Sequence, residues 1–160
     1  MSVDTSAAVR SHEENWQPVL ELAVEEVFEI MLGCRVKTTP HSEHEIHGEF
    51  TAMIGLAGSL CGVLSVCCNA ETARQLAKCM LGDSVNSEDQ VSDALGEICN
   101  MVAGNFKNKL SGMDGRCMLS VPSVISGGEY QFRSLANGDL LHVCVLFEGA
   151  PVVVRLELHG

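Results

Sequence analysis

Apolar side chains recur at helical spacing in three stretches of the chain, and this periodicity predicts three helices. Pro18 lies in the first turn of the first helix, where its missing N–H is not needed, and Gly33 is suited to end that helix. Ser87 and Gln90 form a capping-box pattern at the start of the third. Residues 1–14 are polar and are expected to form a tail. The predicted helices are Trp16–Leu32, Ala70–Leu81 and 88–110.

Between the helices, apolar residues come in short runs bounded by turn residues, which is typical of strands. Tight turns are predicted at Ala57-Gly58, Asn137-Gly138 and Glu148-Gly149. The last two strands are apolar enough to present an exposed sheet edge. The predicted strands are Cys34–Thr39, His44–Leu56, Ser59–Asn69, Arg116–Val121, Glu129–Ala136, Leu140–Phe147 and Val152–His159.

The order helix, strand, hairpin occurs twice, and this repetition predicts an internal duplication. Helices packed on one antiparallel sheet then give an α+β fold. No linker or shift of composition divides the chain, so we expect a single domain over residues 1–160.

Amino-acid composition and net charge narrow the range of possible partners and functions. Apolar residues make up 46% of the chain, enough for a packed core, and the formal net charge is −11. Nucleic acids and anionic membrane surfaces both require clustered Lys and Arg, so neither is an expected partner. Residues 1–15 contain no apolar run of the kind that signal peptides carry. A cytoplasmic protein is the expectation.

The eight cysteines form no C-x-x-C pair, and most lie within apolar runs, which indicates reduced, packed thiols. Three histidines, His41, His44 and His47, lie close together in the sequence. No cysteine or carboxylate completes a metal-binding spacing around them, so no metal site is predicted.

The predicted helix over 88–110 separates its residues into two faces. One is apolar and suited to burial. Glu97 and Asn100 are three residues apart on the other, where an anion and a neutral amide become neighbours. Gly104 lies on the same stripe, where a missing side chain allows another molecule to approach. The polar stripe consists of Asp93, Glu97, Asn100, Gly104 and Asn108.

The run DALGEICNMVAGN over residues 93–105 resembles the E-x-x-N signature of the CheC/CheX/FliY family, in its CheX form. The resemblance extends over most of the chain. It includes the glycine-punctuated hairpin at 55–66, the helix at 73–82 that precedes the signature, and the Pro-containing segment Ser120–Gly127 that follows it.

The resemblance implies a phosphatase that removes the phosphoryl group from a CheY-like response-regulator receiver domain. Glu97 would pair with the receiver's active-site lysine, and Asn100 would hold the attacking water. Mg²⁺ would belong to the receiver, and the chain would form a homodimer. Val24 lies three residues after Glu21 in the first helix, so a second E-x-x-N site is not expected. Further partner contacts would come from Asp93, Gly96, Met101, Gly104 and Asn108.

Two alternatives remain open. The first is a receiver-binding or scaffold module without catalysis, against which the intact Glu97/Asn100 pair speaks. The second is a small-molecule or metal binder, which the absence of ligand spacing disfavours. Cys99 lies between the two polar residues but on the apolar face, so we interpret it as a packing residue.

Overall fold

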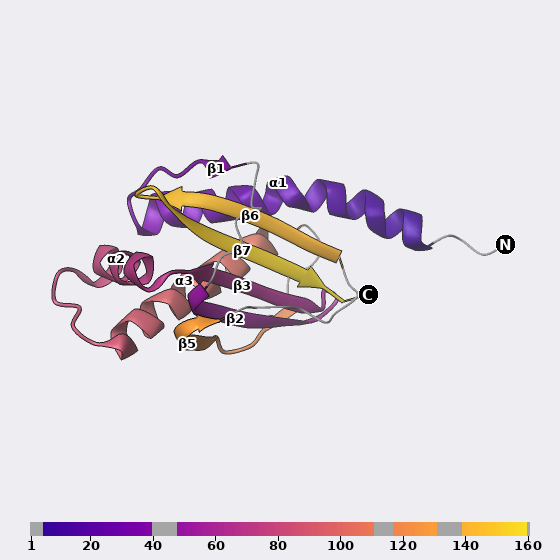
Figure 1. The fold of residues 1–160 in the computed structure, drawn as a ribbon. Helices are drawn as coiled ribbons and strands as arrows, with labels where there is room; N and C mark the ends of the chain where they lie inside the picture. The colour runs from indigo at the N-terminus through magenta and orange to yellow at the C-terminus, as the bar shows by residue number, and fades with distance from the viewer. Residues whose placement is uncertain (1–4, 40–47, 111–116, 131–138, 160) are drawn as a thin grey trace.

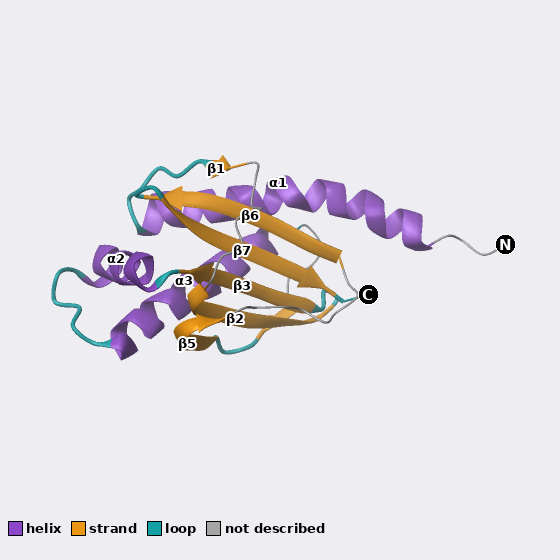
Figure 2. Cartoon of the chain, in the orientation of Figure 1, coloured by secondary structure: helices purple, strands orange, loops and turns teal. Residues whose placement is uncertain are grey.

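The protein was examined as a computed structural model, which describes residues 5–39, 48–110, 117–130 and 139–159 (Figures 1 and 2). In these ranges, helices pack on one antiparallel sheet, so the predicted α+β class is confirmed. The helices are α1 (Thr5–Met31), α2 (Ala70–Leu81) and α3 (Glu88–Lys109). The strands are β1 (Thr38–Thr39), β2 (Gly48–Gly58), β3 (Gly62–Cys68), β4 (Cys117–Leu119), β5 (Ser123–Tyr130), β6 (Asp139–Phe147) and β7 (Ala150–Leu158).

The sheet has an internal symmetry. Its strand order is β1-β6-β7-β3-β2-β4, and β5 also pairs with β2. Exchanging β1, β2 and β3 with β4, β6 and β7 reproduces this order in reverse. The two halves meet at the centre, where β3 and β7 pair with Val66 opposite Val154. A duplicated helix, strand and hairpin unit has this symmetry.

The hydrophobic core lies between the sheet and the helices. Helix α3 passes behind the sheet in Figure 1, α2 packs against α3 at the left of the view, and α1 contacts both α3 and β6. Alternate residues of β7 point into this core because side chains alternate across a strand, so Val154 and Leu156 are buried. Phe28 of α1 meets Phe147 of β6, with ring centroids 6.1 Å apart.

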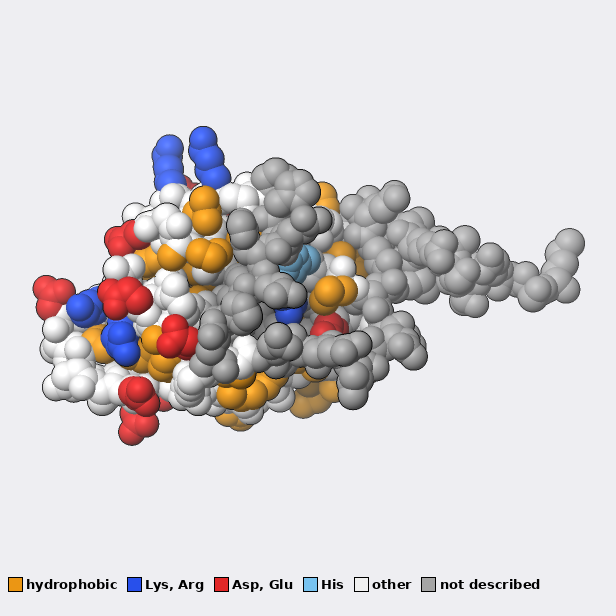
Figure 3. Space-filling model, in the orientation of Figure 1, with side chains coloured by type: hydrophobic (Ala, Val, Ile, Leu, Met, Phe, Trp, Pro, Cys, Tyr) orange, Lys and Arg blue, Asp and Glu red, His pale blue; other side chains and the backbone are white. Residues whose placement is uncertain are grey.

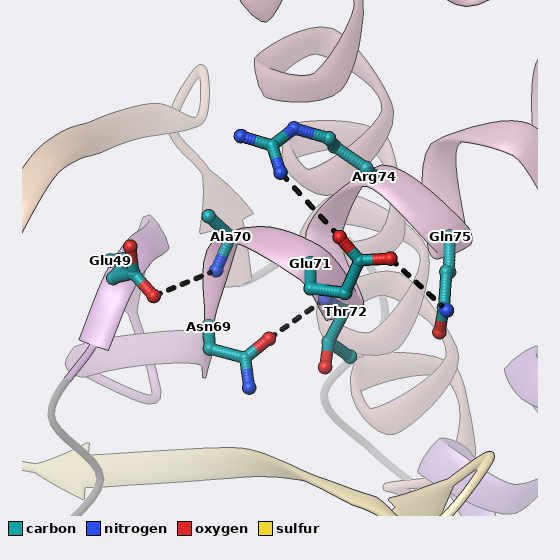
Figure 4. Close-up of polar contacts among 7 residues, drawn as sticks. All are labelled: Glu49, Asn69, Ala70, Glu71, Thr72, Arg74 and Gln75. Carbon is teal, nitrogen blue, oxygen red and sulfur yellow. Dashed lines mark hydrogen bonds and ion pairs between the residues drawn. The ribbon is translucent and has the colours of Figure 1, made fainter.

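Helix α2 has the predicted boundaries, and polar contacts hold both ends. Figure 4 shows those at its start. At its start, the Asn69 side-chain oxygen accepts a hydrogen bond from the Thr72 N–H at 2.8 Å. The Glu49 carboxylate of β2 accepts another from the Ala70 N–H at 3.3 Å. At its end, the Gly82 N–H donates to the Lys78 carbonyl at 2.8 Å. These bonds satisfy backbone groups that the helix itself leaves without partners.

Helix α1 is longer than predicted. It begins at Thr5, so residues 5–14 are helical, where the sequence predicts no helix. Pro18 therefore lies inside the helix, which continues past the missing N–H. Ala and Glu in the preceding turns are strong helix formers, which favours this extension. Gly33 has a φ of +64°, and the Cys34 N–H donates to the Phe28 carbonyl at 3.1 Å, as expected near a helix end.

Several strand boundaries differ from the predictions. Strand β2 runs through Gly58, so the turn lies at 59–61 and not at Ala57-Gly58. Its pairing with β3 continues to Leu56, and its pairing with β4 continues to Gly58, opposite Cys117. Strand β1 contains two residues, and β5 begins at Ser123, where pairing with β2 starts. The Glu148-Gly149 turn is confirmed, with φ of 49° and 82°. Residues 44–47 and the predicted Asn137-Gly138 turn lie outside the described residues.

The prediction that the last two strands present an exposed edge is wrong for β7, and β6 is covered over part of its length. Strand β7 pairs with β3 on one side and β6 on the other. Strand β6 pairs with β1 at Cys144 and Val145. Farther along this side of β6, the Gln17 side chain of α1 donates to the His142 carbonyl at 2.7 Å and accepts from the His142 N–H at 3.4 Å. The side-chain amide of Gln17 thus takes the place of a neighbouring strand's peptide group. This leaves the backbone of His142 unable to pair with another strand.

Charged side chains of both signs lie together over the end of the molecule that carries α2 (Figure 3). In the described part of the chain, none of the helices combines the length and the apolarity that crossing a bilayer requires.

Candidate active site on α3

Local contacts define the start of α3. The Ser87 hydroxyl accepts a hydrogen bond from the Gln90 N–H at 3.3 Å, as the capping-box pattern predicts. The Gln90 side chain reaches back to the N–H of Asn86, at 2.9 Å, one residue before the cap. Glu88 and Asp89 lie in the first turn and two lysines in the last, an arrangement that the helix dipole favours.

The apolar face of α3 is buried, as predicted, and it anchors the helix on the sheet. Leu95, Ile98 and Phe106 are at most 1% exposed. Cys99 is fully buried, and its S–H donates to the Leu64 carbonyl of β3 at 3.7 Å. Burial raises the pKa of the Cys99 thiol to about 12, so the thiol stays protonated at neutral pH. This geometry agrees with a packing role for Cys99.

The predicted polar stripe lies on the surface of α3. Glu97, Asp93 and Asn108 are exposed, while Asn100 and Gly104 are partly exposed. Among the residues that the structure describes, neither Glu97 nor Asn100 has a hydrogen-bond or ion-pair partner for its side chain. The carboxylate and the carboxamide are neighbours on one face of the helix and are both free to bind a ligand.

The other predicted contact residues differ from one another. Met101 is partly buried and packs against the core, so only part of its side chain is accessible. Gly96 is buried, and a β-carbon there would lie 3.6 Å from side-chain atoms of both Pro122 and Val124. At Gly104, by contrast, an added β-carbon would have open space around it, with no atom of the described residues outside its own helix turn within 4 Å. The packing of this chain therefore does not require glycine at position 104.

A groove runs beside Glu97. It has a volume of about 500 Å³, and its two walls come from segments that are distant in the sequence. One wall is the polar side of α3, and the other is the segment that leads from β4 into β5. The lining residues are Ser92, Asp93, Gly96, Glu97, Val121, Pro122 and Val124. Asn100, Gly104 and Asn108 lie outside the groove.

The sequence analysis did not assign a site role to Val121, Pro122 or Val124. Their signal was present in the resemblance of Ser120–Gly127 to the family's segment after the signature. What the sequence lacked was the packing of this segment against Gly96, which brings it to the edge of the polar stripe.

A second hollow, of about 200 Å³, lies between α2 and the start of α3. Arg74 and Lys78 line it together with Phe50 and Val91, and it contains none of the predicted site residues. In the described ranges, no three His, Cys, Asp or Glu side chains form a group that could hold a metal ion. His41, His44 and His47 lie outside those ranges.

Comparisons with known proteins identify the family of the chain. The family model "Chemotaxis phosphatase CheX" matches residues 50–146, which include all of α3. The CheY-P phosphatase CheX of Thermotoga maritima is 30% identical over 117 residues, covering 70% of this chain and 76% of the relative.

Two solved structures share the fold. The chemotaxis protein CheX of Desulfovibrio desulfuricans is 24% identical, with a TM-score of 0.79 over 91% of this chain and 99% of that one. The CheX–CheY–BeF3–Mg²⁺ complex of Borrelia burgdorferi gives 22% identity and a TM-score of 0.72, over 89% of this chain and 97% of that one.

Proposed function

The chain belongs to the CheX family of chemotaxis phosphatases, and from this premise we propose that it hydrolyses the aspartyl phosphate of a CheY-like receiver domain. Glu97 and Asn100 are the residues that we assign to the reaction. The observation that carries the proposal is that both side chains lie on one accessible face of α3 with no partner among the described residues. The Thermotoga maritima relative bears the name of a CheY-P phosphatase.

The chemistry suits this pair. Hydrolysis of an aspartyl phosphate forms a bond between a water oxygen and phosphorus and breaks the bond from phosphorus to the aspartate oxygen. The phosphatase needs no nucleophile of its own, because positioning the water and stabilising charge supply most of the acceleration. The Asn100 carboxamide accepts a hydrogen bond from the water and directs its lone pair at phosphorus. The aspartate leaves as a carboxylate.

Glu97 acts on the receiver. Its carboxylate pairs with the receiver's active-site lysine, which binds the two proteins and orients the helix over the phosphoryl group. We expect any Mg²⁺ to be held by the receiver. In support, the Borrelia burgdorferi complex contains CheY and Mg²⁺ together with CheX.

The alternative is a receiver-binding scaffold without catalysis. Single-turnover dephosphorylation distinguishes the two hypotheses. It measures the phosphatase concentration that gives half-saturation separately from the maximal rate. Asn100→Ala should lower the maximal rate by roughly 10²–10³, the usual loss for one preorganised polar group, and leave half-saturation unchanged. Asn100→Asp should not restore it, since the new charge would lie near the phosphoryl dianion.

The matched control is Gln75→Ala, which removes an amide from α2, outside the polar stripe. It should behave as wild type. A wild-type maximal rate in Asn100→Ala would reject the water-positioning role and favour the scaffold.

We also propose that the chain forms a homodimer, as the family resemblance implies. Exposed apolar side chains support a surface for self-association, including Leu140 and Leu146 of β6, which are 54% and 44% exposed. Sedimentation at micromolar concentration should give about twice the chain mass, and a monomer at all concentrations would reject this proposal.

A further inference from the structure

Val121 is an apolar side chain held out into solvent beside the candidate active site. It is 84% exposed, the highest value among the large hydrophobic residues whose side-chain burial is described. It lines the same groove as Glu97, on the opposite wall. Single exposed apolar side chains are common on protein surfaces. It is therefore the place of Val121 in the same groove as Glu97, and not its exposure alone, that points to a binding role.

The backbone around Val121 is fixed on both sides. The preceding residue, Ser120, is tied to Gly55 of β2: the Ser120 N–H donates to the Gly55 carbonyl at 2.9 Å, and the Gly55 N–H donates to the Ser120 hydroxyl at 2.8 Å. The following residue, Pro122, has a restricted φ and lies against α3 at Gly96. Val121 is thus presented in one arrangement before any partner binds, which lowers the entropy cost of binding.

The groove also has a distinct charge. Its α3 wall carries the carboxylates of Asp93 and Glu97, and none of the seven residues that line it is cationic. The complementary surface is therefore a cation flanked by an apolar side chain. A receiver whose lysine enters this groove to reach Glu97 also meets the opposite wall, because one groove contains both.

On the basis of the proposed function, we propose that Val121 is an apolar docking contact for the receiver domain and packs against an apolar side chain next to the receiver's active-site lysine. Its side chain has no polar atom with which to orient water. Its contribution therefore belongs to binding, and it should set which receivers the phosphatase accepts without changing the chemical step.

The test is single-turnover dephosphorylation of the CheY-type receiver that wild type dephosphorylates fastest, over a range of phosphatase concentrations. Val121→Ser should raise the half-saturating concentration about tenfold, the loss expected for one valine side chain that is no longer buried. Val121→Asp should raise it further, because its charge repels the phosphoryl group and is buried on docking. Maximal rates should stay within about twofold of wild type, since the reacting groups are unchanged.

Ile30→Ser is the matched control, because Ile30 is 75% exposed and lies on α1, outside the groove. It should leave both parameters as in wild type. Circular dichroism and thermal unfolding should show the same fold in all variants, since Val121 supports no core contact.

Half-saturation equal to that of wild type in both Val121 variants would overturn the docking role, as would a lower maximal rate at unchanged half-saturation. Failure of the proposed function itself would be seen separately, as no acceleration of phosphate loss by the wild-type protein.

Discussion

The Lys109 ammonium of α3 lies 2.8 Å from the Glu26 carboxylate of α1. The same carboxylate oxygen accepts a hydrogen bond from the Asn105 side chain at 3.0 Å. These contacts join the first helix to the last turns of the helix that carries the candidate site. The two hydrogen bonds, from Lys109 and then Asn105, lower the pKa of Glu26. Asn105 belongs to the signature run, so the structure gives it a role within the chain.

This contact should make stability depend on pH. A carboxyl group whose pKa is lower in the folded state stabilises the fold at pH values above its unfolded pKa, 4.5. That stabilisation is lost as the pH falls through the folded value. Wild type should therefore be more stable than Glu26→Gln at pH 7, and the difference should shrink below about pH 4.5. Thermal unfolding of both proteins from pH 3 to pH 7 measures this difference in stability. A difference that does not change with pH would reject the ion pair's contribution.

Glu97 should contribute to binding as well as to rate. Glu97→Ala should raise the half-saturating concentration of phosphatase at least about tenfold and lower turnover, because the pairing with the receiver's lysine is lost. Glu97→Lys should be worse, since it places two cations together. Glu21→Ala is the matched control: Val24, three residues after it, is fully buried and cannot hold a water. A large loss of rate in a folded Glu21→Ala would show that α1 carries a second site.

Replacing Gly104 should change stability and receiver binding in opposite directions. Open space surrounds the position of its missing β-carbon, so Gly104→Ala should stabilise the protein by about 1 kcal/mol through higher helix propensity. Position 104 follows Asn100 by one turn on the polar stripe, so the added methyl should obstruct the receiver and weaken its binding. Chemical denaturation and single-turnover kinetics on the same preparation measure the two effects. Unchanged binding would mean that the receiver does not approach α3 at this position.

Cys99 should matter for folding and not for catalysis. Cys99→Ala should lower the free energy of unfolding by about 1–2 kcal/mol, as small truncations in a core do. The phosphatase rate should persist, because a thiol whose pKa is raised to about 12 supplies no thiolate at neutral pH. Urea denaturation and the dephosphorylation assay test this together. Lost activity in a stable Cys99→Ala protein would contradict the packing role.

Short-range patterns determined much of this protein. The boundaries of α2 and the start of α3 follow from caps within a few residues, and the structure confirms both. Glu97 and Asn100 are neighbours because a helix brings residues three apart onto one face, whatever surrounds it. The buried face of α3 follows from the same periodicity. These features depend on local geometry, which the order of residues encodes directly.

Where the strand and turn predictions failed, a distant segment had altered the local preference. The prediction of a turn at Ala57-Gly58 is wrong because pairing with β3 and β4 extends β2 through Gly58. The apolar sequence of the last two strands predicts an exposed edge. In the structure, β7 pairs with β3 from the other half of the chain, and Gln17 covers part of β6. Such pairings depend on contacts between residues that are far apart in sequence, and no local pattern specifies them.

In the candidate site, too, some features follow from the local sequence and others from tertiary contacts. The sequence by itself determined the polar stripe, with Glu97 beside Asn100 on one helix face. Only the tertiary structure placed Val121 and Pro122 across a groove from Glu97 and tied Ser120 to Gly55, 65 residues away. The physical reason is that the helical repeat sets the first arrangement, whereas the second requires β4 and β5 to pair with β2 and α3 to pack on the sheet.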